Sequence, residues 1–363
     1  MRVLRIVAEL DFGGVEKVLA NSVPQFDNIK EIEIMVLVLG KGGRVAEELK
    51  SKGIQVLVWE KNPCIPNISL LFQLKAFFKE LKPVVIHTQG AEANFHGILA
   101  GKWAGVSKII GEEIGLPNHH SYWKYIFKYV YAKAHQVIAI SEAVKDKIVS
   151  LGEVKADKVQ VLYNPIQQVE NLEVASYSKA QSNKKTDFVF VTTCRLVAIK
   201  NLERLIEAFS QLVLHTNDSN PRLHIIGDGP DREKLETLCY SKELTGYVNF
   251  LGFQENVLPF LKEADVFVLP SLSEGSSVSL AEAMAFGLPS IVTKVGGASE
   301  ILGNSNSGFL IDPLDTQDLK NSMLKMISLS PDERKAMGQR AKEQAKSFSV
   351  DHYLESLLNV YKL

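Results

Sequence analysis

The sequence has few cysteines, almost no net charge and no long apolar run. Three cysteines, Cys64, Cys194 and Cys239, occur in 363 residues. Because their number is odd and their spacing wide, they form neither a disulfide framework nor a zinc-binding pattern. We therefore expect a protein of a reducing compartment, the cytoplasm.

The charges are nearly balanced, with 41 Lys and Arg against 42 Asp and Glu and a formal net charge of -1. This balance excludes non-specific nucleic-acid binding by the whole surface, but it allows a local basic patch. The composition, 46% hydrophobic and 23% charged, is that of a globular protein. A chain of this length suits two domains better than one.

The sequence also shows no signal peptide and no membrane-spanning segment. Residues 1–10, MRVLRIVAEL, are strand-like and lack the apolar core and cleavage site of a signal peptide. No segment approaches the roughly 18 apolar residues of a transmembrane helix. We expect a soluble protein, or one that lies at most on a membrane surface.

Short apolar, β-branched runs alternate with helical patterns in the first half of the chain. The runs are apolar throughout, which is typical of a parallel sheet covered by helices on both faces. We expect strands at 3–10, 32–39, 54–60, 82–88, 107–113, 135–140 and 158–164, and helices between them, for example at 16–23, 70–81 and 141–151.

A second alternation follows a polar stretch at 167–186. Its strands are expected at 187–193, 222–227, 247–252, 265–270, 289–293 and 307–312. The pattern predicts an α/β protein with two Rossmann-like parallel-sheet domains facing a central cleft, where ligands bind at the carboxyl ends of the strands. The predicted domains are 1–166 and 187–348 with 167–186 as linker, and the last helix, 349–363, is expected to pack back on the first domain.

Residues 274–282, EGSSVSLAE, place two carboxylates around a small-residue turn between an expected strand and an expected helix. A helix that begins near Ser276 or Ser277 would offer free amide groups to an anion. Eight residues of helix rise about 12 Å. Glu274 and Glu282 could therefore bind different parts of one long ligand.

Helix capping explains the same glutamates equally well. Ser279 with Glu282, and Ser271 with Glu274, both have the S-x-x-E spacing of a capping box. This stretch alone favours neither ligand binding nor helix capping.

Cations and an aromatic residue follow other expected strands of the second half. Arg195 and Lys200 flank a turn after 187–193, where they suit a diphosphate or are simply solvated charges. Phe253 follows 247–252, where it could stack on a base or belong to the core.

The order of these motifs resembles that of the family 4 glycosyltransferases. The resemblance rests on RLVAIKN at 195–201, IIGDGPDREKLE at 225–236, VNFLGF at 248–253 and the long motif at 265–302. It covers nearly the whole chain, and the order is specific although each motif alone is weak. The family consists of retaining enzymes with the two-Rossmann-domain GT-B fold.

The resemblance implies roles for the residues of the second half. Arg195 and Lys200 would hold the donor diphosphate, and Glu274 would bind hydroxyls of the transferred sugar; we take these three as the catalytic set. Glu282 would bind the ribose and Phe253 the base. Backbone amides would orient the sugar and phosphate at Gly275, Ser276, Ser277 and Val278.

In the first half, the resemblance places Gly13 and Gly14 against the donor diphosphate; a simple tight turn is the alternative. Relatives often have a histidine after the strand that here ends in Glu112 and Glu113. His87, His119 and His120 are weaker candidates for contacts with the sugar or acceptor.

Residues 119–135 interleave aromatics with lysines at helical spacing. This pattern suits either a helix in a membrane interface, with contacts from Trp123, Lys124, Phe127 and Lys128, or an ordinary core helix. The membrane interpretation predicts peripheral contact with the inner face of the cytoplasmic membrane.

The expected reaction is transfer of a sugar, with retention, from a nucleotide diphosphate donor to a hydroxyl of a saccharide acceptor, which is expected to be lipid-linked. A UDP-sugar is the commonest donor in the family. No metal or cofactor is expected, because the family it resembles has no Asp-x-Asp metal requirement and the sequence has no such motif. An epimerase of the same fold and a non-catalytic nucleotide-sugar binding protein stay open, while an NAD dehydrogenase is disfavoured by the missing GxGxxG.

Overall fold

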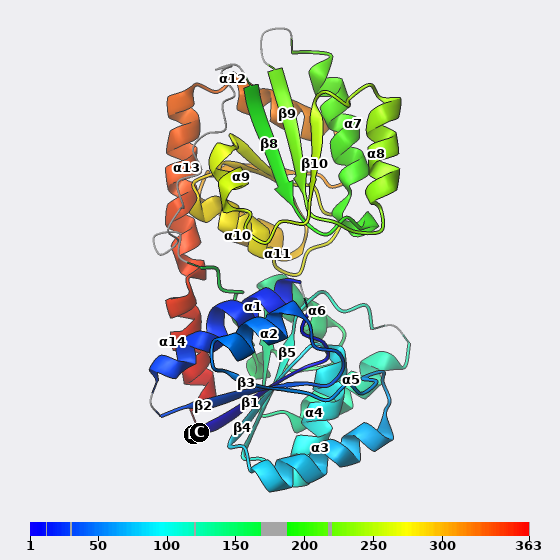
Figure 1. Ribbon diagram of the computed structural model, residues 1–363, viewed down its shortest axis with the longest axis vertical. Coiled ribbons are helices and arrows are strands. Elements are labelled where there is room, and N and C mark those ends of the chain that lie inside the picture. Colours follow the sequence, from blue (N-terminus) through cyan, green and yellow to red (C-terminus); the bar gives the residue numbers. More distant parts are fainter. Residues whose placement is uncertain (12, 30, 120, 168–186, 217–219, 363) are drawn as a thin grey trace. The chain divides into compact units, whose positions relative to one another are not determined.

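Two units, each built around its own parallel β-sheet, make up the chain (Figure 1). The structure, a computed structural model, describes residues 1–363 except 12, 30, 120, 168–186, 217–219 and 363. Unit 1 consists of Met1–Ile166 and Phe348–Leu363, and unit 2 of Gln167–Ser347. Apart from Gln167, the linker expected at 167–186 lies outside the described residues.

Unit 1 contains a seven-stranded sheet in the order β3-β2-β1-β4-β5-β6-β7, with every pairing parallel. The strands expected in this part are confirmed, with shorter bounds. They are β1 (Arg2–Val7), β2 (Glu33–Val38), β3 (Gln55–Val58), β4 (Val85–Gln89), β5 (Lys108–Glu113), β6 (Gln136–Ala139) and β7 (Val159–Val161).

The helices of unit 1 cover both faces of its sheet. Figure 1 shows α1, α2 and α14 on one face and α3, α4 and α5 on the other. The helices are α1 (Gly14–Ser22), α2 (Arg44–Ser51), α3 (Ile68–Leu81), α4 (Ala91–Ala104), α5 (Trp123–Lys133), α6 (Glu142–Ser150) and α14 (Val350–Tyr361), with 3-10 turns η1 (Val23–Asn28), η2 (Ala156–Lys158) and η5 (Lys346–Phe348).

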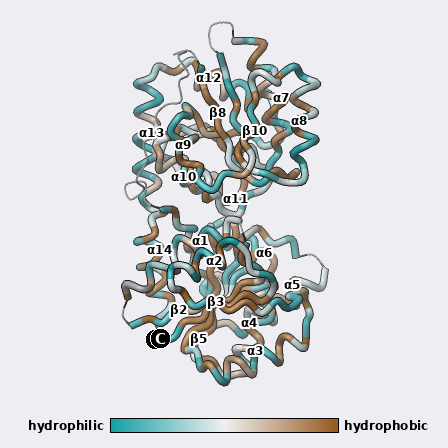
Figure 2. The backbone as a smooth tube through the Cα atoms, viewed as in Figure 1, coloured by the Kyte–Doolittle hydropathy of each residue, from teal (hydrophilic) through white to brown (hydrophobic). Residues whose placement is uncertain are grey.

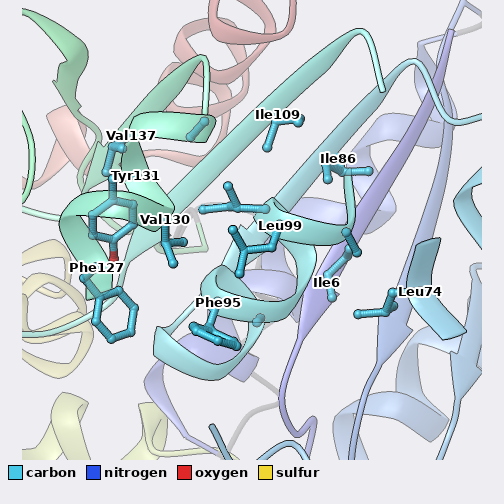
Figure 3. Close-up of a cluster of buried hydrophobic side chains, with 14 of the residues drawn as sticks. Ile6, Leu74, Ile86, Phe95, Leu99, Ile109, Phe127, Val130, Tyr131 and Val137 are labelled. Carbon is cyan, nitrogen blue, oxygen red and sulfur yellow. The ribbon is translucent and has the colours of Figure 1, made fainter. Parts of the chain in front are cut away.

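The core of unit 1 forms where apolar strands meet the helical layer. Figure 3 shows Ile6, Ile86 and Ile109 from neighbouring strands, with Leu99 of α4 and Val130 of α5. In Figure 2 the hydrophobic residues concentrate on the strands, as expected for a parallel sheet buried on both faces.

Unit 2 repeats this plan with six parallel strands in the order β10-β9-β8-β11-β12-β13. All strands expected in this half are confirmed. They are β8 (Asp187–Thr193), β9 (Asn220–Ile226), β10 (Val248–Gly252), β11 (Val266–Leu269), β12 (Ser290–Thr293) and β13 (Gly308–Ile311).

In unit 2, α7, α8 and α12 lie on one face of the sheet and α9, α10, α11 and α13 on the other (Figure 1). The helices are α7 (Leu202–Val213), α8 (Arg232–Ser241), α9 (Leu258–Glu263), α10 (Val278–Ala285), α11 (Gly296–Leu302), α12 (Thr316–Ser328) and α13 (Pro331–Ala345), with the 3-10 turn η4 (Ala198–Lys200). The predicted fold, two Rossmann-like parallel-sheet domains, is therefore confirmed.

A buried polar network joins the sheet of unit 1 to the C-terminal helix. Arg5 of β1 is fully buried, with Nη2 3.7 Å from the Glu112 carboxylate and Nη1 3.4 Å from the hydroxyl of Tyr361. His87 lies between them, 2.7 Å from Glu112 and 2.8 Å from the same Tyr361 hydroxyl. This network fixes α14 on the sheet.

The charges of this network depend on one another. Burial, aided by the positive charge of Arg5, lowers the pKa of His87 to about 4, so the imidazole is neutral at pH 7. Burial alone would raise the pKa of Glu112, but the hydrogen bond from His87 and the charge of Arg5 hold it below its usual value. A charged carboxylate thus faces a buried guanidinium.

We expect Arg5→Met to destabilise unit 1 strongly, because it leaves the buried carboxylate of Glu112 without its cation. Removing one partner of a buried ion pair costs about 3–5 kcal/mol. Arg2→Met is the matched control: Arg2 lies on the same strand and pairs with Glu33 at 3.0 Å, but both side chains are exposed. Such pairs contribute about 0–1 kcal/mol. Urea unfolding of both variants measures the difference, and equal losses would contradict the account.

Candidate active site

An ion pair joins two loops at the carboxyl edge of the unit 2 sheet. Nζ of Lys200 lies 2.6 Å from Oε2 of Glu274, and the side chains are only 21% and 11% exposed. The hydroxyl of Ser271 donates to the same carboxylate oxygen at 3.2 Å. The strands that precede these loops, β8 and β11, are neighbours in a parallel sheet, so their carboxyl ends meet at one edge.

Main-chain and side-chain bonds hold these loops in place. The N–H of Leu272 donates to the carbonyl of Ile199 at 2.8 Å, and the N–H of Gly297 donates to the carbonyl of Glu274 at 3.0 Å. Asn201 does not cap α7 with its side chain; instead its amide donates to the carbonyls of Pro270 and Pro313 at 3.1 and 3.0 Å. The position of Glu274 is thus set before any ligand arrives.

The helix after Glu274 begins with open amide groups. Ser277 is the N-cap of α10, and its hydroxyl accepts the N–H of Leu280 at 3.3 Å. Among the described residues, the N–H groups of Gly275, Ser276 and Val278 donate to no main-chain carbonyl. Such a helix start favours an anion.

The capping-box alternative fails for both glutamates. The N-cap of α10 is Ser277, so Ser279 lies inside the helix and cannot form a capping box with Glu282. Ser271 contacts Glu274, but it precedes no helix. Glu282 lies half-buried in α10, in the turn after the open amides.

Arg195 stands exposed on the loop after β8. Its guanidinium forms no hydrogen bond or ion pair within the part of the chain that the structure describes. Glycines of the next loop shape this turn: a Cβ on Gly227 would lie 1.9 Å from the carbonyl oxygen of Cys194, and one on Gly229 2.4 Å from that of Leu196. These glycines serve packing, as expected of a shaping turn.

Phe253 follows β10 with 39% of its surface exposed. A core residue of this size would be nearly inaccessible, so the core alternative is excluded. The exposed ring is compatible with stacking on an aromatic ligand.

In unit 1, Gly13 and Gly14 are exposed at the start of α1. A Cβ on Gly14 would meet no protein atom within 4 Å, so packing does not demand glycine there. A Cβ on Gly13 would lie 2.5 Å from a carboxylate oxygen of Glu16. Glu16 has no counterpart among the residues predicted from the sequence; burial and then the negative charge of Asp11 raise its pKa.

The histidine candidates fare differently. His87 is fully buried, with Nδ1 2.8 Å from the Tyr361 hydroxyl and Nε2 2.7 Å from the Glu112 carboxylate, which corrects the expectation that it contacts a sugar or an acceptor. Nδ1 of His119 lies 2.8 Å from the buried carboxylate of Glu153, and its ring stacks on Phe127 at 4.1 Å. His120 lies outside the described residues.

The membrane contacts expected on α5 also need correction. Phe127 is buried under His119, so it cannot enter a lipid surface. Trp123 packs against the core and is half-buried, as is Lys124, whereas Lys128 is exposed. None of the helices in the described ranges combines the length and apolar character needed to cross a bilayer.

A buried carboxylate ends β5. Glu113 accepts a hydrogen bond from the Tyr131 hydroxyl and lies 3.4 Å from the side-chain amide of Asn94. Burial raises the pKa of Glu113 to about 7, although the Tyr131 and His119 contacts act in the opposite direction. A group this perturbed next to a strand end fits a functional site or a buried structural hydrogen-bond network.

Glu113→Gln tests this pKa through stability. The folded-state pKa of about 7 lies above the unfolded value of 4.5, so the contribution of Glu113 is fully present below pH 4.5 and is lost as the pH rises through 7. From pH 5 to 8, the stability of the variant relative to wild type should rise by up to about 3 kcal/mol.

The measurement is urea unfolding of both proteins at each pH. Glu47→Gln, at an exposed position, is the control, since it changes no buried group. A Glu113→Gln difference that stays constant with pH would show that the carboxyl titrates normally.

Comparison with known proteins agrees with this architecture. Residues 12–168 match the family model described as Glycosyltransferase Family 4, and residues 175–344 match that of the Glycosyl transferases group 1. The fold and the two matches define a GT-B glycosyltransferase. The chain belongs to the family 4 glycosyltransferases.

Individual relatives are distant. An uncharacterized glycosyltransferase of Methanocaldococcus jannaschii is 30% identical over 63% of this chain, and the match spans only 60% of that relative's length. The UDP-Gal:alpha-D-GlcNAc-diphosphoundecaprenol alpha-1,3-galactosyltransferase of Escherichia coli is 27% identical over 72% of each chain.

Among solved structures, Alr3699/HepE of Anabaena in complex with UDP superimposes with a TM-score of 0.84. The superposition covers 99% of both chains at 21% identity. This likeness shows the shared fold.

Proposed function

We propose that this glycosyltransferase moves a sugar from a UDP-sugar to a hydroxyl of a saccharide acceptor, with retention of configuration and without a metal ion. The observation that carries the proposal is the Lys200–Glu274 pair, 2.6 Å apart beside the open amides of α10. A cation, an acceptor of hydroxyl hydrogen bonds and free N–H groups are the three things that a nucleotide sugar needs at its scissile bond.

In this proposal Lys200 exchanges its partner when donor binds. Its ammonium group leaves the carboxylate for the diphosphate, where Arg195 adds a planar fork of donors. Glu274 is then able to accept hydrogen bonds from hydroxyls of the transferred sugar. The amides of Gly275, Ser276, Ser277 and Val278 orient the sugar and phosphate.

The remaining donor contacts come from residues placed by the family resemblance. Glu282 binds the ribose hydroxyls and Phe253 stacks on the base. Gly13 and Gly14 of unit 1 approach the diphosphate; the open space over Gly14 permits such an approach.

The reaction is a same-face substitution at the anomeric carbon. The bond from this carbon to the phosphate oxygen breaks, the acceptor oxygen forms the new bond, and the acceptor proton passes to the leaving phosphate. Lys200, Arg195 and the helix amides stabilise the negative charge on the leaving group, and each such donor is worth about 3 kcal/mol. Glu274, paired with Lys200, is poorly suited to be a covalent nucleophile.

Uridine and a lipid-linked acceptor are supported by the relatives. The Escherichia coli relative is named for UDP-Gal and a diphosphoundecaprenol acceptor, and the Anabaena structure contains UDP. We extend both to this chain, with the enzyme in the cytoplasm at the inner face of the membrane. An epimerase of the same fold would instead convert donor without acceptor, and a binding protein would do neither.

The donor site is tested by titration with UDP, GDP, ADP and TDP. We expect UDP to bind most tightly, and Lys200→Ala to weaken it by about a hundredfold, because a charge-assisted phosphate contact is lost. Lys234→Ala is the matched control: Lys234 pairs with Glu203 at the same 2.6 Å, but on the open surface.

If Lys200→Ala binds UDP as wild type does, the diphosphate site is misplaced. If another nucleotide binds best, only the choice of uridine is wrong.

Retention and metal independence are tested in one reaction. Donor and a saccharide acceptor are incubated with the enzyme in excess EDTA, and the anomeric configuration of the product is determined by NMR. We expect full turnover and an α-linked product from an α-linked donor. An inverted product would refute the same-face mechanism, and loss of turnover that added Mg²⁺ or Mn²⁺ restores would refute metal independence.

A further inference from the structure

Unit 1 exposes a group of large apolar side chains on α3 and α4. Ile68 is 64% exposed, Phe72 59% and Trp103 44%. The rings of Phe72 and Trp103 lie 6.1 Å apart, so the two helices present one continuous apolar surface. Single exposed apolar residues are ordinary, but a contiguous aromatic group marks a contact surface.

Lysines continue this surface along α3. Residues 68, 72, 75 and 79 follow the helical spacing i, i+4, i+7 and i+11, which places Ile68, Phe72, Lys75 and Lys79 on one stripe. Lys82, at the C-cap of α3, extends the stripe. Glu80 is the one carboxylate of α3. It follows Lys79 directly and therefore points about 100° away from the stripe around the helix axis.

A hollow of about 310 Å³ lies at the lysine end of the stripe. Its lining includes Lys79, Lys82 and Ser107, together with Ala104, which directly follows Trp103 in α4. Two lysines and a hydroxyl around a hollow of this size suit an anionic headgroup. The apolar and the anion-binding parts thus adjoin one another.

We propose that this α3–α4 surface, formed by Ile68, Phe72, Trp103 and the lysines at 75, 79 and 82, docks on the headgroup layer of an anionic lipid bilayer. Trp and Phe insert their rings at the boundary of the acyl chains, and the lysines reach the phosphates. The inference rests on the proposed function only in that a lipid-linked acceptor requires the enzyme to meet a membrane.

The charge of the surface favours lipid over a second copy of the chain. In a two-fold dimer the same patch meets itself, which would set the lysines of one copy against those of the other. Protein interfaces are depleted in lysine, whereas anionic lipids attract it. The aromatic residues and cations together therefore fit a bilayer best.

The surface of α5 is the alternative within unit 1. Tyr122, Tyr125 and Tyr129 are exposed there, but Lys124 and Lys133 lie over two of these rings, at 5.1 and 4.7 Å from their centres. Its tryptophan is half-buried. The α5 surface is therefore tested separately, by its own pair of substitutions.

The test is cosedimentation of the full chain with phosphatidylcholine vesicles, with and without phosphatidylglycerol, in the absence of donor and acceptor. We expect binding only to the anionic vesicles. Phe72→Ser with Trp103→Ser, and Lys75→Glu with Lys79→Glu, should each weaken it by about tenfold or more. Leu214→Ser with Tyr240→Ser, at exposed apolar positions of unit 2, should change nothing.

Urea unfolding shows that each variant is folded, and UDP binding shows that the donor site is intact. The proposal is overturned if the wild-type protein does not bind anionic vesicles, if both variants of the α3–α4 surface bind them normally, or if only Tyr125→Ser with Tyr129→Ser abolishes binding. It is also overturned if the variants of the α3–α4 surface break a dimer of the free protein instead. If the wild-type protein does not bind UDP, only the proposed donor site is wrong, and the vesicle experiment still tests the proposed membrane surface.

Discussion

The ion pair between Lys200 and Glu274 is the contact on which the account of unit 2 depends. It joins loops that are 74 residues apart in sequence and follow neighbouring strands of a parallel sheet. A half-buried pair of this kind holds a cation and a carboxylate ready at one sheet edge, without the mobility of surface side chains. Both groups bind the nucleotide sugar in the proposed reaction. Phosphate replaces the carboxylate as the partner of Lys200, and sugar hydroxyls replace the ammonium group as the partners of Glu274. The ion pair can therefore hold the two loops in position before the donor binds, and it breaks when the donor binds.

The sheet of unit 1 depends on a different buried charge. Arg5 is the third residue from the carboxyl end of β1, and the C-terminal helix reaches it through Tyr361. This contact, with the neutral His87 and the charged Glu112, explains why residues 348–363 belong to unit 1 although unit 2 precedes them in sequence. The titratable groups near the end of β5 thus divide into a network that holds α14 and a second one around Glu113, and neither leaves His87 available to a ligand.

Most of the fold could be predicted from the sequence, because apolar β-branched runs mark buried parallel strands by themselves. The site could be predicted only in part. Glu274 and Lys200 stand in recognisable motifs, but their contact with each other depends on strand order. The partners of His119 could not be found, since Glu153 is 34 residues away and its burial depends on packing. The aromatic pattern of 119–135 left a membrane helix and a core helix open for the same reason: helical spacing does not tell which face is buried, and Phe127 lies on the inner face.

The central claim, that Glu274 holds the transferred sugar while Lys200 holds the diphosphate, is tested most directly by the affinity of Glu274→Gln for UDP and for UDP-sugar. The account predicts that the variant binds UDP at least as tightly as wild type, because Lys200 is released from its carboxylate. The extra affinity that wild type shows for the UDP-sugar over UDP should be lost. Equal weakening of both ligands would contradict the account, since it would show that Glu274 supports the loop and does not contact the sugar.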